Sequence, residues 1–353
     1  GAVGERLADP GDPLHQRALE QLVQQAEAPP EAARWLLDGM ARDWTTRALQ
    51  TLLEREFGDP TVLDRFMAVP STDFPDRRRR ALVVGRFGGV GVHISSGSVP
   101  GVSVTSMLRG LLVKSPVLLK PGRADVVLPR LFAAGLTEAA EHSTVARALA
   151  DALAVLWWPG GQAPEIEGPV LEQAGYVVVY GDDETTRSVR SRVPGGTPVV
   201  DYPHRVSVAV VDAQPNLDDA RDLADAVAAF DQRGCVSVQQ CFVLGDAEQA
   251  QGWAAMVARQ LARLDVERPP EPATAAEASV VQQLRGTFEL REAAGEAVGI
   301  WSGPGTRWTV VLDTADGPPF SCHSRTLRVV PLSSIAALRS ALTRYRGRLQ
   351  AVG

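Results

Sequence analysis

The segment Asp231-Gln232-Arg233-Gly234-Cys235-Val236-Ser237-Val238-Gln239-Gln240 joins two regular elements and places a cysteine between them. Asn216 to Phe230, before it, has the pattern of a helix with an asparagine cap and acidic residues in its first turn. Val236 to Leu244, which overlaps its end, is an apolar run typical of a strand. Helix, tight connection and strand in this order predict an α/β fold here, with Cys235 held between rigid elements.

Cys235 has two interpretations at this point. A nucleophilic thiol needs such a position, because it must be held as thiolate and reached by a substrate, and its free pKa of about 8.5 must be lowered locally. A small buried hydrophobic residue is the commoner outcome for a lone cysteine, since free cysteine is among the most buried residue types. The local pattern alone favours the second interpretation.

Strand and helix patterns alternate on both sides of this segment. Residues 81–180 show short β-branched runs separated by helical patterns, and the alternation returns over residues 207–264. This alternation predicts largely parallel sheets covered by helices on both faces. Residues 14–26 and 30–57 carry Leu, Ala and Trp at helical spacing and predict two helices of an N-terminal layer. Residues 269–277, rich in Pro, Ala and Glu, predict a loop.

The composition is that of an ordinary globular protein of two or more domains. The chain has 353 residues, is 45% hydrophobic and 22% charged, and has a formal net charge of −6. This mildly acidic balance gives no indication of nucleic acid or of an anionic membrane surface as a partner. The basic run Arg77 to Arg80 is interpreted as a solvated loop. No apolar run approaches the ~18 residues of a membrane span, and no signal peptide is visible.

The chain contains three cysteines, Cys235, Cys241 and Cys322. Their number is odd and their spacing is not that of metal ligands, so we expect no metal, free thiols and a cytoplasmic location. Cys241 and Cys322 are expected to be buried structural thiols.

Two stretches upstream change the interpretation of Cys235. They are His93 to Gly101, and Met107 to Gly122 with its Val-Leu-Leu-Lys-Pro-Gly ending. With residues 176–190 and the Cys235 segment, they resemble the aldehyde dehydrogenase superfamily. The resemblance is closer to its long-chain acyl-CoA reductase branch, the LuxC family of bacterial bioluminescence. It extends from about Ala81 to Gly353, with three separated motifs in the same order.

The resemblance implies an aldehyde dehydrogenase-like α/β fold with two parallel-sheet domains. Residues 1–203 are expected to form the N-terminal helices and a Rossmann-like NADP-binding domain, and residues 204–353 a catalytic thiol domain. Members of the LuxC family continue beyond the motif that Leu349 to Gly353 resembles. A C-terminally shortened chain is therefore one expectation.

Lys120 and Arg123 are the residues that the resemblance assigns first to a cofactor. Lys120 follows a short predicted strand, and ligands of parallel sheets bind at the carboxyl ends of strands. In the superfamily the matching lysine binds the adenosine ribose hydroxyls. NAD-specific relatives carry an acidic residue where this chain has Arg123, so we predict NADPH over NADH, because arginine suits a phosphate. Solvated loop ends are the alternative for both.

Two glycine turns complete the expected cofactor site. Gly181 follows the predicted strand Tyr176 to Tyr180 and matches the superfamily turn that packs against the cofactor pyrophosphate. Asp182 and Asp183 depart from that pattern and would oppose a phosphate. Gly161, in Pro159-Gly160-Gly161, marks another turn on the cofactor side. An ordinary strand-to-helix turn and an ordinary loop are the alternatives.

The resemblance also implies a chemistry in which Cys235 attacks a thioester carbonyl and expels coenzyme A. The resulting acyl-cysteine is reduced by NADPH and released as an aldehyde. The family's oxyanion donors are the cysteine N–H and an asparagine, whose place is taken by Ser98 here. The water-activating glutamate of aldehyde oxidisers has no counterpart in residues 199–206, where Asp201 and His204 lie. His204 is a candidate proton shuttle or a structural residue.

The expected substrate is therefore an acyl-CoA or another acyl thioester, with a fatty or an aromatic acyl group. The resemblance further implies a partner enzyme that activates the acid and transfers the acyl group, and a homo-oligomer. Two alternatives stay open. One is NAD(P)-dependent oxidation of free aldehydes, and the other is a non-catalytic subunit with this fold.

Overall fold

The computed structural model describes residues 1–26, 30–70, 80–85, 88–212, 214, 216–315 and 322–353. These residues form two compact units, Gly1–Pro203 and His204–Gly353, called unit 1 and unit 2 below. Arg77 to Arg79 of the basic run lie outside the described residues. Nowhere in these ranges is a helix both long and apolar enough to cross a membrane.

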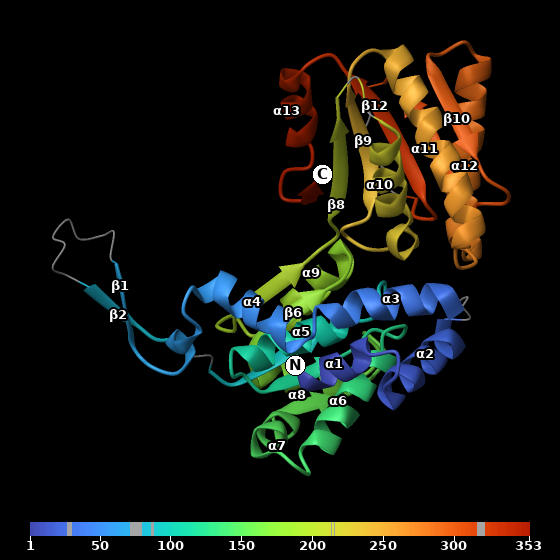
Figure 1. Ribbon diagram of the computed structural model, residues 1–353. Coiled ribbons are helices and arrows are strands. Elements are labelled where there is room, and N and C mark those ends of the chain that lie inside the picture. The colour runs from blue at the N-terminus through green and yellow to red at the C-terminus, as the bar shows by residue number, and fades with distance from the viewer. Residues whose placement is uncertain (27–29, 71–79, 86–87, 213, 215, 316–321) are drawn as a thin grey trace. The chain divides into compact units, whose positions relative to one another are not determined.

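Unit 1 is built on a parallel sheet with the strand order β5-β4-β3-β6-β7, and helices pack against it (Figure 1). A separate antiparallel ribbon pairs β1 with β2, Met67 opposite Val83. The elements are α1 (Ala2–Ala8), α2 (Pro13–Ala26), α3 (Pro30–Arg42), α4 (Thr46–Phe57), η1 (Pro60–Leu63), β1 (Met67–Pro70), β2 (Arg80–Val83), β3 (Val90–Ile94), α5 (Val102–Leu112), β4 (Val117–Lys120), α6 (Val127–Ala139), α7 (Thr144–Asp151), β5 (Leu153–Val155), α8 (Pro164–Glu172), β6 (Ala174–Tyr180), α9 (Asp183–Arg192) and β7 (Val199–Tyr202).

The N-terminal helical layer is present, but the helix predicted over residues 30–57 is two helices, α3 and α4. The break has a local cause. Thr45 takes an extended conformation and its side chain accepts a hydrogen bond from Ala48 N, which starts α4. Trp44, just before it, is buried against Phe132 of α6 with the two rings edge to face at 6.3 Å. Trp44 is buried although it lies between the two helices. Its apolar side chain therefore fits the helical spacing of residues 30–57, and that pattern did not reveal the break.

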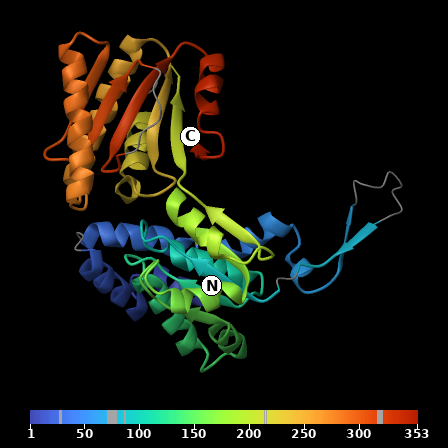
Figure 2. The same ribbon diagram turned by 180° about the vertical axis from the view of Figure 1, so that it is seen from behind.

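Unit 2 contains a six-stranded sheet with the order β10-β11-β12-β9-β8-β13, in which only the β10–β11 pairing is antiparallel. Figure 2 shows this sheet from behind. The elements are β8 (Val206–Val211), α10 (Leu217–Ala228), η2 (Ala229–Gln232), β9 (Val238–Leu244), α11 (Ala247–Glu267), α12 (Ala275–Ala293), β10 (Val298–Ser302), β11 (Thr309–Asp313), β12 (Thr326–Leu332), α13 (Ile335–Thr343) and β13 (Leu349–Val352).

The two faces of the unit 2 sheet bury different helices. Cys241 and Val243 of β9 face α10 and α11, where Trp253 and Leu261 fill the core. Phe242, between them in sequence, points to the opposite face and packs near α13, as the two-residue period of a strand requires. Both units thus have the predicted α/β class, with helices on a mostly parallel sheet.

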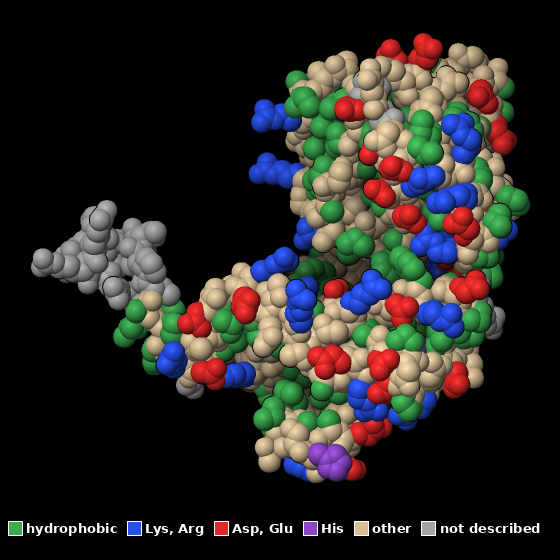
Figure 3. Space-filling model, viewed as in Figure 1, with side chains coloured by type: hydrophobic (Ala, Val, Ile, Leu, Met, Phe, Trp, Pro, Cys, Tyr) green, Lys and Arg blue, Asp and Glu red, His purple; other side chains and the backbone are tan. Residues whose placement is uncertain are grey.

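Two elements of unit 2 were not predicted. The predicted loop 269–277 ends in a capping box, in which Thr274 accepts from Glu277 N and the Glu277 carboxylate accepts from Thr274 N. This box starts helix α12, which packs against β10. Strand β13 pairs in parallel with β8 at the sheet edge and was also missed. On the face of unit 2 shown in Figure 3, basic and acidic side chains are interspersed.

Candidate functional site

Cys235 lies in the turn that connects η2 to β9, and its side chain is exposed. The turn is fixed at its base. Ser207 of β8 donates a hydrogen bond from its hydroxyl to the Cys235 carbonyl oxygen at 2.7 Å, and Ser237 donates to Ala229 O at 2.7 Å. In the described part of the chain, the backbone N–H of Cys235 has no acceptor. Cys235 therefore presents both its thiol and an N–H donor from an anchored backbone.

The residues just before Cys235 have an unusual backbone. Phe230, Asp231 and Gln232 have φ values of 54°, 48° and 64°, three consecutive non-glycine residues in the left-handed region. Each such residue costs on the order of 1 kcal/mol or more and persists only when its surroundings over-determine it. The restraining contacts come from another left-handed segment, His323, Ser324 and Arg325, with φ values of 54°, 50° and 52°.

Gln232 is the first link between these two segments. Its side chain is completely buried, and Nε2 donates to the carbonyl oxygens of Val238 at 2.8 Å and of Thr326 at 2.7 Å. Its Oε1 accepts a hydrogen bond from Thr326 N at 2.8 Å. The side chain thereby uses three of its hydrogen-bonding positions on the backbones of β9 and β12. The His323 ring nitrogen Nδ1 lies 3.1 Å from the Gln232 carbonyl oxygen.

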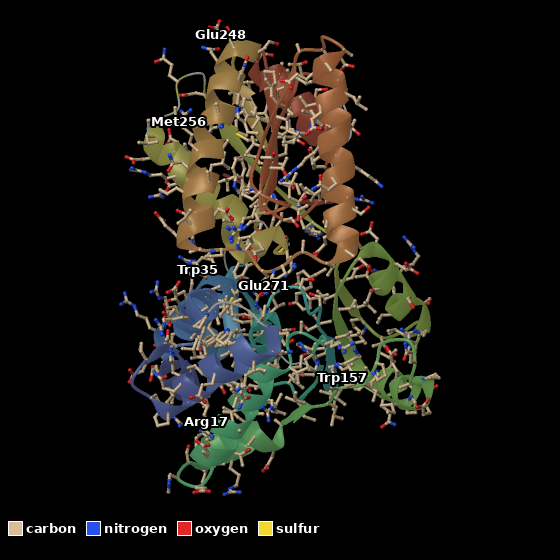
Figure 4. All side chains as sticks on the ribbon, turned by 90° about the vertical axis from the view of Figure 1, so that its right-hand side faces the viewer. Arg17, Trp35, Trp157, Glu248, Met256 and Glu271 are labelled. Carbon is tan, nitrogen blue, oxygen red and sulfur yellow. The ribbon has the colours of Figure 1, made fainter. Side chains whose placement is uncertain are left out.

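Asp231 is the second link. Its Oδ1 accepts from Arg325, with Nε at 2.8 Å and the terminal nitrogen at 2.6 Å, and its Oδ2 accepts from Glu271 N at 2.9 Å. Glu271 lies in the loop between α11 and α12 (Figure 4), and its carboxylate pairs with Arg233 at 2.5 Å. Arg325 is buried and also donates to Arg268 O at 2.9 Å. We call Asp231, Gln232 and Arg325 the thiol-loop clamp.

The other two thiols are buried, as predicted. Cys241 is fully buried in β9, where Trp253 Nε1 lies 3.3 Å from its sulfur, and burial raises its pKa to about 12. Burial also raises the pKa of Cys322. Neither thiol is reached by a substrate or readily forms a thiolate, so Cys235 is the exposed thiol of the three.

His204 is exposed and lies two residues before the start of β8. It lies three residues before Ser207, the residue that binds the Cys235 carbonyl. Three residues of extended chain span about 10 Å, so His204 and Cys235 belong to the same end of the unit 2 sheet. Asp201, the other residue considered in this region, belongs to β7 and pairs with Arg190 at 3.1 Å.

The five candidate residues of unit 1 all lie at the carboxyl edge of its sheet. Ser98 follows β3, Lys120 ends β4, Arg123 lies three residues on, Gly161 follows β5, and Gly181 follows β6. The neighbouring strand order β5-β4-β3-β6 brings these four strand ends side by side. This edge is where parallel α/β sheets place their ligands.

The loops after β3 and β4 approach very closely. A Cβ atom on Gly122 would lie 2.2 Å from Gly97 N, so position 122 admits only glycine without a backbone shift. This approach holds the loop of Ser98 against the loop of Arg123. Ser98 and Arg123 are both exposed, and Gln25 donates to the Arg123 carbonyl oxygen at 3.0 Å.

Lys120 is 8% exposed, and its amino nitrogen lies 5.6 Å from the ring centre of Trp158. Burial lowers its pKa, and the charge of Glu167 opposes this shift. Glu167 is itself paired with Arg192 at 2.9 Å, and no carboxylate of the described residues forms an ion pair with Lys120. The Lys120 amino group thus lies beside the Trp158 ring, and its N–H groups can donate to ligand hydroxyls such as those of a cofactor ribose.

The glycine turns fit a cofactor unequally. Gly161 has a φ of 69° and nothing within 4 Å of a Cβ position, so its turn is open. At Gly181 the following helix α9 is capped by Asp182, whose carboxylate accepts from Thr185 N at 2.7 Å. A phosphate at this helix start would meet that carboxylate and those of Asp183 and Glu184. At the Gly181 turn the backbone could face a pyrophosphate, but the carboxylates that follow it would repel one.

Two buried titratable residues support the Ser98 loop and α5. Asp125 accepts from Gly101 N at 2.7 Å and Ser103 N at 2.8 Å, and burial raises its pKa to about 6. His93 of β3 has Nδ1 2.8 Å from the Ser106 hydroxyl, and burial lowers its pKa to about 4. No local sequence signal marks Asp125 as an anchor for α5, because the backbone groups that it binds lie more than 20 residues earlier in the chain.

Comparison with solved structures identifies the class of fold. The solved structures that resemble this chain include several aldehyde dehydrogenases. A putative aldehyde dehydrogenase from Anabaena variabilis has a TM-score of 0.66 at 13% identity, covering 99% of this chain and 77% of that one. A NAD-dependent benzaldehyde dehydrogenase from Corynebacterium glutamicum has a TM-score of 0.66 at 17% identity, with coverages of 99% and 76%. The fold is aldehyde dehydrogenase-like, as the resemblance implied.

The chain belongs to the LuxC family, described as acyl-CoA reductase, because the family model matches residues 3–353. A long-chain acyl-protein thioester reductase of Photobacterium phosphoreum is 24% identical over 200 residues, which are 56% of this chain and 38% of that protein. One from Aliivibrio fischeri is 23% identical over 201 residues, 56% of this chain and 39% of that protein. These matches span well under half the length of either relative.

Proposed function

We propose that this chain reduces an acyl thioester, in particular an acyl-CoA, to an aldehyde through a covalent acyl-Cys235 intermediate, with NADPH as reductant. The observation that carries the proposal is the state of the three thiols. Cys235 is exposed on a turn anchored by the hydroxyl hydrogen bonds of Ser207 and Ser237, whereas Cys241 and Cys322 are buried. Membership of the LuxC family, together with relatives that are acyl-protein thioester reductases, supports the choice of substrate class.

In the first step the Cys235 sulfur forms a bond to the acyl carbon, and the bond from that carbon to the carrier sulfur breaks. We propose that His204, at the same end of the sheet, accepts the proton of the Cys235 thiol and donates it to the carrier sulfur, so that the carrier leaves as a thiol. The negative oxygen that forms on the way needs hydrogen-bond donors, which contribute a few kcal/mol each. The Cys235 backbone N–H, which has no acceptor in the described part of the chain, is one such donor. We propose the exposed Ser98 hydroxyl as the other.

The cofactor residues follow from the carboxyl edge of the unit 1 sheet. Lys120 would donate to the adenosine ribose hydroxyls, Arg123 to the 2′-phosphate, and the backbones of the Gly161 and Gly181 turns would face the pyrophosphate. When bound, NADPH supplies the hydride that converts the acyl-cysteine to an aldehyde. Arg123 is exposed and offers a planar fork of donors, which supports the preference for NADPH over NADH.

The fate of the acyl-cysteine separates reduction from aldehyde oxidation. Oxidation needs a base that activates water, and residues 199–206 contain no glutamate. Asp201, the carboxylate there, is already paired with Arg190. This arrangement favours acyl exchange with a thiol carrier over hydrolysis.

The test is intact mass measurement after mixing the protein with fatty and aromatic acyl-CoAs, beside Cys235→Ala. We expect an acyl adduct only when Cys235 is present, and release of aldehyde on adding NADPH. Absence of an adduct with every thioester would overturn the proposal. Oxidation of free aldehyde without coenzyme A would then support an aldehyde dehydrogenase, and lack of both activities a non-catalytic subunit.

We also propose a cytoplasmic homo-oligomer that receives its acyl group from an acid-activating partner enzyme. The names of the relatives, which specify an acyl-protein, support a protein donor. Light scattering of the purified protein measures the oligomeric state. Transfer of a labelled acyl group from a candidate donor enzyme to Cys235 tests the partner.

A further inference from the structure

Unit 1 carries a cavity of about 500 Å³ between helices α4 and α5. Thr105, Leu108, Arg109 and Leu112 line it from α5 and recur at the spacing of one helix face. The opposite wall comes from the end of α3, the Trp44 turn and α4. The volume lies in the range of pockets that hold small organic ligands. None of the residues assigned to the proposed reaction lines it.

The charge of the lining is strongly one-sided. Arg42, Arg47, Arg55 and Arg109 contribute to it, against one acidic residue, Asp43. All four arginines are exposed, and among the described residues none of them forms an ion pair. Guanidinium groups gathered without carboxylate partners favour an anion with several oxygens, because each offers a planar fork of donors.

The inner wall of the cavity is apolar and rigid. Leu49 and Leu108 are buried, and Leu112 is half-buried. Trp44 is buried and donates from Nε1 to the Thr105 hydroxyl at 3.0 Å, which fixes the indole between the two helices. An apolar wall with a cationic rim suits a ligand that has an extended, weakly polar chain and phosphate groups.

The direction of α5 relates this cavity to the reaction. The helix begins at Val102, shortly after Ser98, and its first turn is anchored by Asp125. Arg109 lies roughly 10 Å along the helix axis from Val102, at 1.5 Å per residue. A ligand that lies along α5 from the Ser98 loop would therefore reach Arg109 and would pass along the arginine-lined wall.

We propose that this cavity binds the phosphate-bearing arm of the thioester carrier, the phosphopantetheine chain of coenzyme A or of a carrier protein. This inference rests on the proposed thioester reduction. The new element is the place where the carrier binds and the residues that select it. The arginines bind the phosphate, and the leucines contact the pantetheine chain.

The experiment compares three thioesters of one fatty acyl group: the acyl-CoA, the acyl-N-acetylcysteamine, which lacks phosphate, and the acyl group on a phosphopantetheine-bearing carrier protein. For the double variant Arg47→Gln/Arg55→Gln we expect kcat/KM with acyl-CoA to fall about a hundredfold, since each of the two charge-assisted bonds contributes about tenfold. The value with acyl-N-acetylcysteamine should stay unchanged. Arg34→Gln, an exposed arginine of α3 outside the cavity, is the matched control. Calorimetry with coenzyme A alone gives the same comparison without turnover.

The outcomes separate the two proposals. If the wild-type protein reduces none of the three thioesters, the proposed function fails. If it reduces them and the double variant treats acyl-CoA, the carrier-borne substrate and coenzyme A itself like the wild type, the function stands and the cavity proposal is refuted. A larger loss with acyl-CoA than with the carrier-borne substrate supports coenzyme A as the occupant, and the reverse supports the carrier protein.

Discussion

The thiol-loop clamp makes a quantitative prediction for Gln232→Glu. This change keeps the shape of the side chain but replaces the Nε2 donor with an oxygen. That oxygen would face the carbonyl oxygens of Val238 and Thr326, at the present distances of 2.8 and 2.7 Å, in a completely buried position. Two hydrogen bonds of about 1 kcal/mol each are lost, and each carbonyl left without a donor costs about 1–3 kcal/mol. We expect the free energy of unfolding to fall by about 4–8 kcal/mol, the sum of these contributions and a large share of a typical total of about 5–15 kcal/mol.

The assay is urea denaturation followed by tryptophan fluorescence and circular dichroism, with Gln282→Glu as the control. Gln282 is exposed on α12, so the same chemical change there should alter stability by no more than about 0.5 kcal/mol. A second measurement is the rate at which acyl-CoA acylates Cys235, which should fall about tenfold or more as the turn loses its fixed geometry. A Gln232→Glu protein with both stability and acylation rate near those of the wild type would refute the clamp.

Three further predictions concern the thiols, the cofactor and pH. The native protein should show one rapidly reacting thiol with a disulfide reagent, and Cys235→Ser none, because the other two thiols are buried. Arg123→Ala should raise the KM for NADPH about tenfold or more and leave that for NADH nearly unchanged. The folded pKa of His93 is lowered to about 4, so its contribution to stability is lost as the pH falls below 6.5. The folded pKa of Asp125 is raised to about 6, so its contribution to stability is lost as the pH rises above 3.8. Each effect is about 3 kcal/mol and the two oppose each other, so urea titrations of the wild type between pH 4 and 6 should show a nearly constant free energy of unfolding. In Asp125→Asn the free energy of unfolding should fall as the pH is lowered, because only the His93 effect remains. In His93→Gln it should fall as the pH is raised toward neutral, because only the Asp125 effect remains.

The parts of the fold that sequence predicts here are those with local signals. Strands such as Val177 to Val179 of β6 are β-branched and bounded by turn residues, so their pattern is clear. Helix α12 gave no such signal, because its buried positions include Arg285, whose guanidinium donates to Thr309 and to three backbone carbonyls. From sequence alone, a charged residue in a helix indicates a solvent-exposed position, and only the structure shows the partners that allow it to be buried.

The site divides in the same way. Cys235 and Lys120 could be proposed as site residues because each stands in a short motif whose neighbours carry the information. Their supports were not found, since Arg325 is far from Asp231 in sequence and nothing local shows that the two left-handed segments meet. The arginine-lined cavity was missed for the same reason: Arg55 and Arg109 belong to two helices that come together only in the fold.

The pairing of β13 with β8 has a consequence for synthesis of the chain. Val206 of β8 leaves the ribosome long before its partner Leu349, because most of unit 2 lies between them in sequence. Until then β8 has an open edge, with backbone groups able to pair with another nascent chain. Unit 1, whose sheet is complete by Tyr202, carries no such delay. Codon choice or a chaperone that acts on residues 206–348 should therefore affect the yield of folded protein more than any change within unit 1.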